Sequence, residues 1–113
     1  MSWIEVRLSD DPSGGAWLEL KHIAEVPEEV WSQFGPGAAG VGWDLGLLGL
    51  AQHLATGRTI PPEATDWMSS PEGKAFVASS SDGWAQASIA AGTPPEDAMP
   101  ARDRTTEFYT AAP

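Results

Sequence analysis

Apolar and polar side chains alternate in two short runs near the start of the chain, residues 2–8 and residues 17–23. Successive side chains of a strand point to opposite faces, so a period of two predicts a half-buried β-strand in each run. The sequence DPSGG between the runs supplies turn-forming residues, with glycines available for a positive φ. We therefore expect an antiparallel hairpin over residues 2–23.

The pattern then changes to a helical one. A short helix is expected over residues 28–34 after Pro27, and the sequence GPG interrupts it. A longer helix is predicted over residues 36–56, because Pro36 suits a first helical turn and Gly57 suits a C-terminal stop. An isolated hairpin is marginal in water, so we expect this helix to lie across its apolar face.

A projection of the long helix at about 100° per residue separates two apolar stripes and one glycine-rich edge. One apolar stripe holds Trp43, Leu47, Leu50 and Leu54. A second stripe, roughly opposite, holds Val41, Leu45 and Leu48. One edge between them holds Gly42, Gly46, Gly49 and His53. Glycine inside a helix costs up to about 1 kcal/mol relative to alanine, so we expect a compensating close approach of a strand, a helix or a ligand along this glycine edge.

The C-terminal half predicts further helices. Residues 58–65 form a proline-containing connector, and Ser70 is typical of an N-cap for a helix over residues 71–91. A capping-box spacing in TPPE, residues 93–96, predicts a third helix. Pro100 falls inside that helix, so we expect a kink or a start near Ala101.

The stretch GPGAAG, residues 35–40, satisfies the glycine pattern of a dinucleotide-binding loop. Such a loop lies between a strand and a helix of a βαβ unit, with an acidic residue about 20 positions further on. The segment before this stretch is expected to be helical, and no following strand of a βαβ unit appears. We therefore interpret these glycines as packing positions.

Charge and cysteine content exclude several classes of function. The 113 residues include sixteen acidic and six basic side chains, for a formal charge of −10. This charge repels phosphate backbones and anionic bilayers, so we expect no nucleic-acid and no membrane partner. The absence of cysteine excludes disulfides and thiolate metal sites. The first residues lack a secretory pattern, and we expect a cytoplasmic protein.

Few side chains are suited to chemistry. His22 and His53 are the only histidines, and we expect them to be polar lining or ordinary partly buried groups. Asp44 is expected to face solvent or to pair with an arginine. The serines of residues 79–81 lack a nucleophile elbow. We therefore predict no catalytic residue, no metal site and no cofactor.

Six tryptophans are spread along the expected elements: Trp3, Trp17, Trp31, Trp43, Trp67 and Trp84. We expect them mainly to fill volume in a small core. An aromatic-lined pocket is the alternative.

The order of several short motifs resembles a known family. They are GAWLELKH at residues 15–22, Gly42-Trp43 with the leucines that follow, and residues 71–109 with Trp84 and RTTEFY at residues 104–109. The first two resemble the closing part of the Activator of Hsp90 ATPase homologue-like group. That group belongs to the START-like, Bet v 1-like (SRPBCC) helix-grip superfamily. The last segment is similar to a helical tail in an actinobacterial subset of the group.

The resemblance implies an antiparallel sheet curved around a long C-terminal helix, with a hydrophobic cavity between them. Here the chain begins at what would be the last two strands, so either the reading frame starts upstream of Met1 or the domain is naturally truncated. Residues 1–57 would be the closing part of a helix-grip domain, and residues 58–113 its helical extension.

These observations together predict an α+β fold: a partial helix-grip domain in which the hairpin packs on the long helix, followed by one or two further helices. We expect a non-catalytic module that binds a hydrophobic small molecule or associates with a chaperone. The expected ligand-binding residues are His22, Trp43, Gly46, Leu47, Gly49, Leu50 and His53. A homodimer or a partner chain would complete the sheet. The alternatives are a cyclase- or hydrolase-like enzyme using the same cavity and a structural remnant that acts as a dimer.

Overall fold

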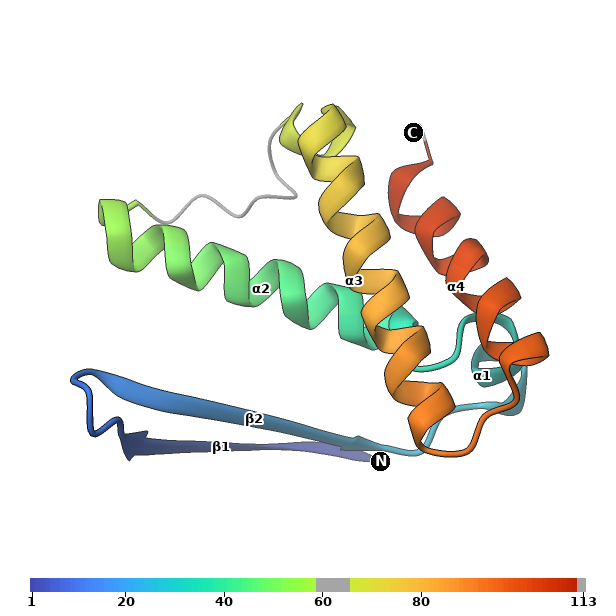
Figure 1. The fold of residues 1–113 in the computed structure, drawn as a ribbon, viewed down its shortest axis with the longest axis horizontal. Helices are drawn as coiled ribbons and strands as arrows, with labels where there is room; N and C mark the ends of the chain where they lie inside the picture. The colour runs from blue at the N-terminus through green and yellow to red at the C-terminus, as the bar shows by residue number, and fades with distance from the viewer. Residues whose placement is uncertain (59–65, 112–113) are drawn as a thin grey trace.

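The computed structural model describes residues 1–58 and 66–111 (Figure 1). In chain order the elements are β1 (Ser2–Asp10), β2 (Ala16–Ala24), α1 (Glu28–Phe34), α2 (Gly37–Thr56), the 3-10 helix η2 (Asp66–Ser69), α3 (Pro71–Ala90) and α4 (Pro95–Thr110). The predicted α+β fold, with a hairpin, a long helix and further helices behind it, is confirmed. Most of the predicted connector, residues 59–65, lies outside the described residues.

The hairpin forms because its turn satisfies its own polar groups. The Asp11 carboxylate accepts hydrogen bonds from the Ser13 backbone N–H at 3.0 Å and from the Ser13 hydroxyl at 2.8 Å. These bonds hold the pKa of Asp11 below its usual value. Gly14 and Gly15 then take φ values of 106° and 82°, which close the turn.

The register pairs Ser2 with Ala24 at one end of the hairpin and Asp10 with Ala16 at the other. Directly paired residues share a face of the sheet. The inner face therefore holds Ile4, Val6, Leu8, Leu18, Leu20 and His22. The outer face holds Trp3, Glu5, Arg7, Trp17, Glu19, Lys21 and Ile23. Every residue of β1 is exposed, so neither face is covered along that strand.

The core lies between α2 and α3. Val41 and Leu45 on α2 and Val77 on α3 are buried. Partly buried side chains pack around them: Trp67, Met68, Phe76, Trp84 and Tyr109. The second apolar stripe of α2 therefore faces the helical core, and the Trp43 stripe is left for the hairpin side. Three of the six tryptophans do not fill core volume as expected, since Trp3, Trp17 and Trp31 are exposed. Trp67 and Trp84 do pack against the core.

Trp84 of α3 lies directly against the backbone of α2 at Gly40. A Cβ atom at Gly40 would overlap the indole ring, so only glycine fits there. The indole N–H donates to the Asp44 carboxylate at 3.0 Å, and the Ser80 hydroxyl donates to the same oxygen at 2.6 Å. The expectation that Asp44 faces solvent or pairs with an arginine is therefore wrong. Its carboxylate is half-buried, and α3 supplies two neutral donors to it.

The glycine edge behaves differently from the prediction. A Cβ atom at Gly46 would meet no atom of another part of the structure within 4 Å. A Cβ atom at Gly42 would lie 3.3 Å from the Tyr109 hydroxyl of α4 and so would not face a strand. Of the partners expected along this edge, a helix approaches Gly42, and no described segment approaches Gly46. A closer approach than that at Gly42 is found two residues earlier, at Gly40, where the partner is Trp84 of α3.

Small residues let α3 and α4 pack closely over most of their length (Figure 1). The buried positions at this contact are Ser81, Ala85 and Ser88 on α3 and Ala98, Ala101 and Thr105 on α4. The Thr105 hydroxyl lies 3.1 Å from the carbonyl oxygen of Phe34 and 2.9 Å from that of Ala101, which ties the end of α1 to α4.

The predicted start of α3 is confirmed, and that of α4 is partly wrong. The Ser70 hydroxyl caps α3 by accepting from the Gly73 N–H at 3.1 Å. At α4, Thr93 makes no cap and instead accepts from the Ser88 hydroxyl at 2.7 Å. The helix begins at Pro95 and continues through Pro100, so the later start does not occur. Pro100 is only the sixth residue of α4, and its ring therefore interrupts the hydrogen bonding of the first turns alone.

Tyr109 fastens α4 to the first turns of α2. Its hydroxyl donates to the Ala38 carbonyl at 2.6 Å. Burial raises the pKa of Tyr109 above its ordinary value of 10.0, although a hydrogen bond from the Gly42 backbone acts in the opposite direction.

This shift gives a pH dependence at the single tyrosine of the sequence. As pH rises above about 10, the unfolded chain releases the phenolic proton before the folded chain does. The Tyr109 contribution to the free energy of unfolding is therefore complete at neutral pH and is lost through the folded pKa. Tyrosinate absorbance should show a higher midpoint in the folded protein than in urea. Equal midpoints would contradict burial of this hydroxyl.

Candidate functional site

The hairpin is joined to α2 by a contact between two aromatic rings. The Trp43 indole N–H donates to His22 Nδ1 at 3.0 Å, and the two rings meet edge to face with centroids 5.6 Å apart. In this arrangement Nδ1 of the imidazole is the acceptor, so Nε2 carries the proton of the neutral ring. His22 belongs to the inner face, and that face is therefore turned toward α2.

From this contact β2 and α2 extend along each other in opposite chain directions (Figure 1). A strand advances about 3.3 Å per residue, so Leu18 lies about 13 Å from His22 along β2. A helix advances about 1.5 Å per residue, so Leu50 and Leu54 lie about 10 and about 16 Å from Trp43 along α2. Leu18 of β2 thus lies on the same side of the Trp43–His22 contact as Leu50 and Leu54 of α2.

Both apolar surfaces remain open to solvent. On α2 the stripe of Leu47, Leu50 and Leu54 is exposed, and Leu54 is 76% exposed. On the inner face Ile4, Val6, Leu8 and Leu18 are exposed, with Leu8 at 70%. Exposed apolar side chains that gather on two facing elements are typical of a binding surface, whereas isolated ones are ordinary. We call this pair of surfaces the hairpin–helix site.

The structure brings together some of the predicted ligand-binding residues. Trp43, Leu47 and Leu50 share one stripe of α2, and His22 lies at its start. Gly46 and Gly49 lie to one side of that stripe, where Gly46 is exposed and Gly49 is half-buried.

His53 is not brought to the other predicted residues at the start of the stripe. It lies about 15 Å further along α2 than Trp43, since ten residues separate them. Its Nδ1 is 2.9 Å from the carbonyl oxygen of Arg58, just beyond the Gly57 C-cap. The two histidines therefore do not meet in one groove.

The three groups considered for catalysis have separate surroundings. His22 accepts from Trp43, Asp44 accepts from Ser80 and Trp84, and His53 lies beside the Arg58 carbonyl. Within residues 1–58 and 66–111, no group of three or more histidine and acidic side chains could hold a metal ion. The geometry assembles no acid–base pair from these residues.

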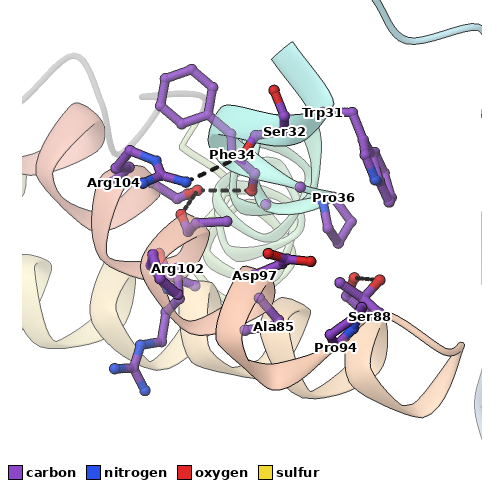
Figure 2. Close-up of a pocket in the computed structure, with 18 of the residues that line it drawn as sticks. Trp31, Ser32, Phe34, Pro36, Ala85, Ser88, Pro94, Asp97, Arg102 and Arg104 are labelled. Carbon is purple, nitrogen blue, oxygen red and sulfur yellow. Dashed lines mark hydrogen bonds between the residues drawn. The ribbon is translucent and has the colours of Figure 1, made fainter. Parts of the chain in front are cut away.

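Sequence reasoning missed a pocket of about 640 Å³ between α1, α3 and α4 (Figure 2). Its walls include Trp31, Phe34, Pro36, Ala85 and Pro94, with Asp97 among them. None of the predicted ligand-binding residues lines it. The pocket depends on how α1 packs against the distant helices α3 and α4, and a single sequence does not show this packing.

The basic groups beside this pocket already have protein partners. Arg104 donates to the backbone carbonyls of Gln33 at 2.7 Å and Ser32 at 3.2 Å, across the end of α1. Arg102 bonds to Asp82 and Asp103, each at 3.0 Å, and these bonds raise its pKa. Arg102 is therefore paired with carboxylates, whereas Arg104 connects α4 to the end of α1 through neutral carbonyls and keeps its positive charge.

Comparisons of the chain with protein-family models, curated proteins and solved structures gave no match. The resemblance to the Activator of Hsp90 ATPase homologue-like group thus stays a prediction. Among the described residues, no helix is long and apolar enough to cross a membrane.

The Trp43–His22 bond predicts a local effect of substitution. Trp43→Phe keeps a ring but removes the donor, and a hydrogen bond of this kind contributes about 1 kcal/mol. Amide hydrogen exchange in β1 and β2 should become about fivefold faster, while exchange in α3 and α4 stays unchanged. Trp17→Phe on the outer face is the matched control and should leave both regions unchanged. Equal acceleration in the hairpin and in α3 would contradict a local role.

Proposed function

We propose that this chain is a non-catalytic module that binds a hydrophobic small molecule at the hairpin–helix site. The observation that carries the proposal is the exposure of two facing apolar surfaces that a polar contact holds in place. The Trp43–His22 bond fixes their relative position without covering the leucines beyond it.

The side chains of the site indicate the class of ligand. The stripe of α2 and the inner face between Ile4 and Leu8 carry aliphatic groups and no charged side chain. Burying apolar surface contributes about 25 cal/mol per Å², so an uncharged ligand with an extended aliphatic or aromatic body would gain most. His22 and Trp43 supply polar atoms at one end, which favours a ligand with a single polar terminus.

The arrangement also supports the family resemblance as a proposal. Two adjacent antiparallel strands followed by a long helix along them is the order expected for the closing part of a helix-grip domain. On that proposal residues 1–57 form the binding portion and residues 58–113 a helical extension. A chaperone-associated role in the cytoplasm would follow from the same resemblance and has no separate support in the geometry.

The enzymatic alternative has no observation in its favour. It needs a polar pair inside the groove, and the candidates His22, His53 and Asp44 lie in three different surroundings. We therefore propose binding without catalysis.

Titration with a hydrophobic fluorescent probe tests the proposal. The folded protein should bind the uncharged probe N-phenyl-1-naphthylamine saturably. Leu50→Gln should weaken binding about tenfold, because it replaces an apolar contact worth more than 1 kcal/mol. Val30→Gln on α1 is a matched control, since Val30 is 38% exposed and Leu50 is 40% exposed.

Circular dichroism first has to show that both variants are folded. Probe binding that does not saturate, or that both variants weaken equally, would overturn the proposal.

A further inference from the structure

The outer edge of β1 presents backbone groups that have no strand partner among the described residues. The Glu25 N–H donates to the Met1 carbonyl at 3.3 Å, and the Asp11 N–H donates to the Gly15 carbonyl at 3.2 Å. Both pairs fit the hairpin register, and both lie on odd-numbered residues of the first strand. Hydrogen-bonded pairs alternate with non-hydrogen-bonded pairs along an antiparallel ladder. Odd residues of β1 therefore bond to β2, and even residues direct their N–H and C=O groups outward.

The even-numbered residues of β1, whose backbone N–H and C=O groups point outward, include Ile4, Val6 and Leu8. The apolar side chains of these three residues lie on the inner face. A two-stranded sheet with exposed faces is marginal in water, and a free edge of this length is a template for another strand. All nine residues of β1 are exposed, so no described side chain blocks the edge.

We infer that β1 pairs with β1 of a second copy of the chain, antiparallel and about a twofold axis at Val6. Val6 then faces the partner's Val6, and Ile4 faces the partner's Leu8. These are even-numbered positions, so the ladder uses the outward N–H and C=O groups of both chains. The result is a four-stranded sheet with order β2, β1, then β1 and β2 of the partner subunit.

The charges of the outer face agree with this register. Glu5 lies opposite the partner's Arg7, and Arg7 lies opposite the partner's Glu5. Within each hairpin Lys21 is already opposite Glu5, with Nζ 3.8 Å from the carboxylate, and Glu19 is opposite Arg7. Across the four strands each row therefore alternates in sign, from Lys21 through Glu5 and the partner's Arg7 to the partner's Glu19.

Neighbouring registers are worse for physical reasons. A shift of two residues in one direction places Glu5 opposite the partner's Glu5, and a shift in the other places Arg7 opposite the partner's Arg7. Like charges directly opposite each other destabilise a sheet. A shift of one residue turns the outward N–H and C=O groups away from their partners. Among these neighbouring registers the pattern therefore favours the one with its axis at Val6.

This self-association goes beyond the proposed ligand binding and does not depend on it. It uses the edge of the sheet, whereas the ligand would lie against the inner face. The same pairing extends the apolar inner face across four strands, which makes each hairpin more stable than it is alone.

Sedimentation velocity with complementary charge variants tests the pairing. The wild-type chain should be a dimer at about 100 µM. Glu5→Arg places a guanidinium group opposite the partner's Arg7, and Arg7→Glu places a carboxylate opposite the partner's Glu5, so each variant alone should be a monomer. A mixture of the two variants should recover the dimer. In the mixed dimer the two substituted side chains face each other with opposite charges, and the unchanged Arg7 of one chain faces the unchanged Glu5 of the other.

The proposed register predicts all three results together, because each two-residue shift already places like charges opposite each other in the wild-type dimer. Each substitution also puts a like charge opposite Lys21 or Glu19 within its own hairpin, and mixing does not relieve that effect. A monomeric wild-type chain, variants that remain dimeric, or a mixture of folded variants that stays monomeric would each overturn the proposal.

A pair of proline variants provides a second test in case the charge substitutions unfold the hairpin. Val6→Pro removes an N–H that points away from β2, and proline is tolerated at such edge positions. Leu20→Pro is its cross-strand counterpart and removes an outward N–H on the other edge of the hairpin. Val6→Pro should abolish the dimer, and Leu20→Pro should retain it. Equal effects of the two substitutions would rule out pairing through β1.

Discussion

The packing of α3 on α2 depends on how Trp84 meets α2. Its ring lies on bare backbone at Gly40, and its N–H is held by Asp44 one turn further along the same helix. Ser80 donates to the same carboxylate, so α3 binds α2 at two positions through one acceptor. A side chain at Gly40 would push the ring away and separate the donor from Asp44. Steric fit and hydrogen bonding are therefore coupled at this contact.

This contact decides which side of α2 is buried. Val41 and Leu45 turn into the helical core with Val77, and Tyr109 and Thr105 bring α4 and the end of α1 to the same side. Among the described residues, the opposite stripe has only the hairpin beside it. The radius of gyration of 15.3 Å exceeds the value of about 13 Å typical of a compact domain of about 100 residues. The hairpin thus extends from the helical core with its apolar side chains largely uncovered.

Most elements could be predicted because their signals are local. The strand alternation, the Ser70 cap, the turn glycines and the Gly57 stop each depend on a few neighbouring residues, and the structure has each of them. The two stripes of α2 were also predictable from helical periodicity. These features need no knowledge of which element packs against which.

The errors concern contacts between distant segments. Glycine spacing indicated close packing along α2, but the edge through Gly46 is open and Gly40 makes the contact, because Trp84 arrives from 44 residues further along the chain. The surroundings of Asp44 could not be predicted for the same reason. Of the candidate site, the Trp43 stripe and His22 were found from the sequence, whereas the pocket beside Trp31 was not. Family, ligand and partner remain predictions.

A double-mutant cycle between Gly40 and Trp84 tests the central contact most directly. In the wild-type background Gly40→Ala should lower the free energy of unfolding by about 1–3 kcal/mol, because it overpacks a close contact. In a Trp84→Leu background the same substitution should be neutral or stabilising by up to about 1 kcal/mol, since alanine is the better helix former. If Gly40→Ala has the same effect in both backgrounds, the two residues are not coupled and this account of the fold is wrong.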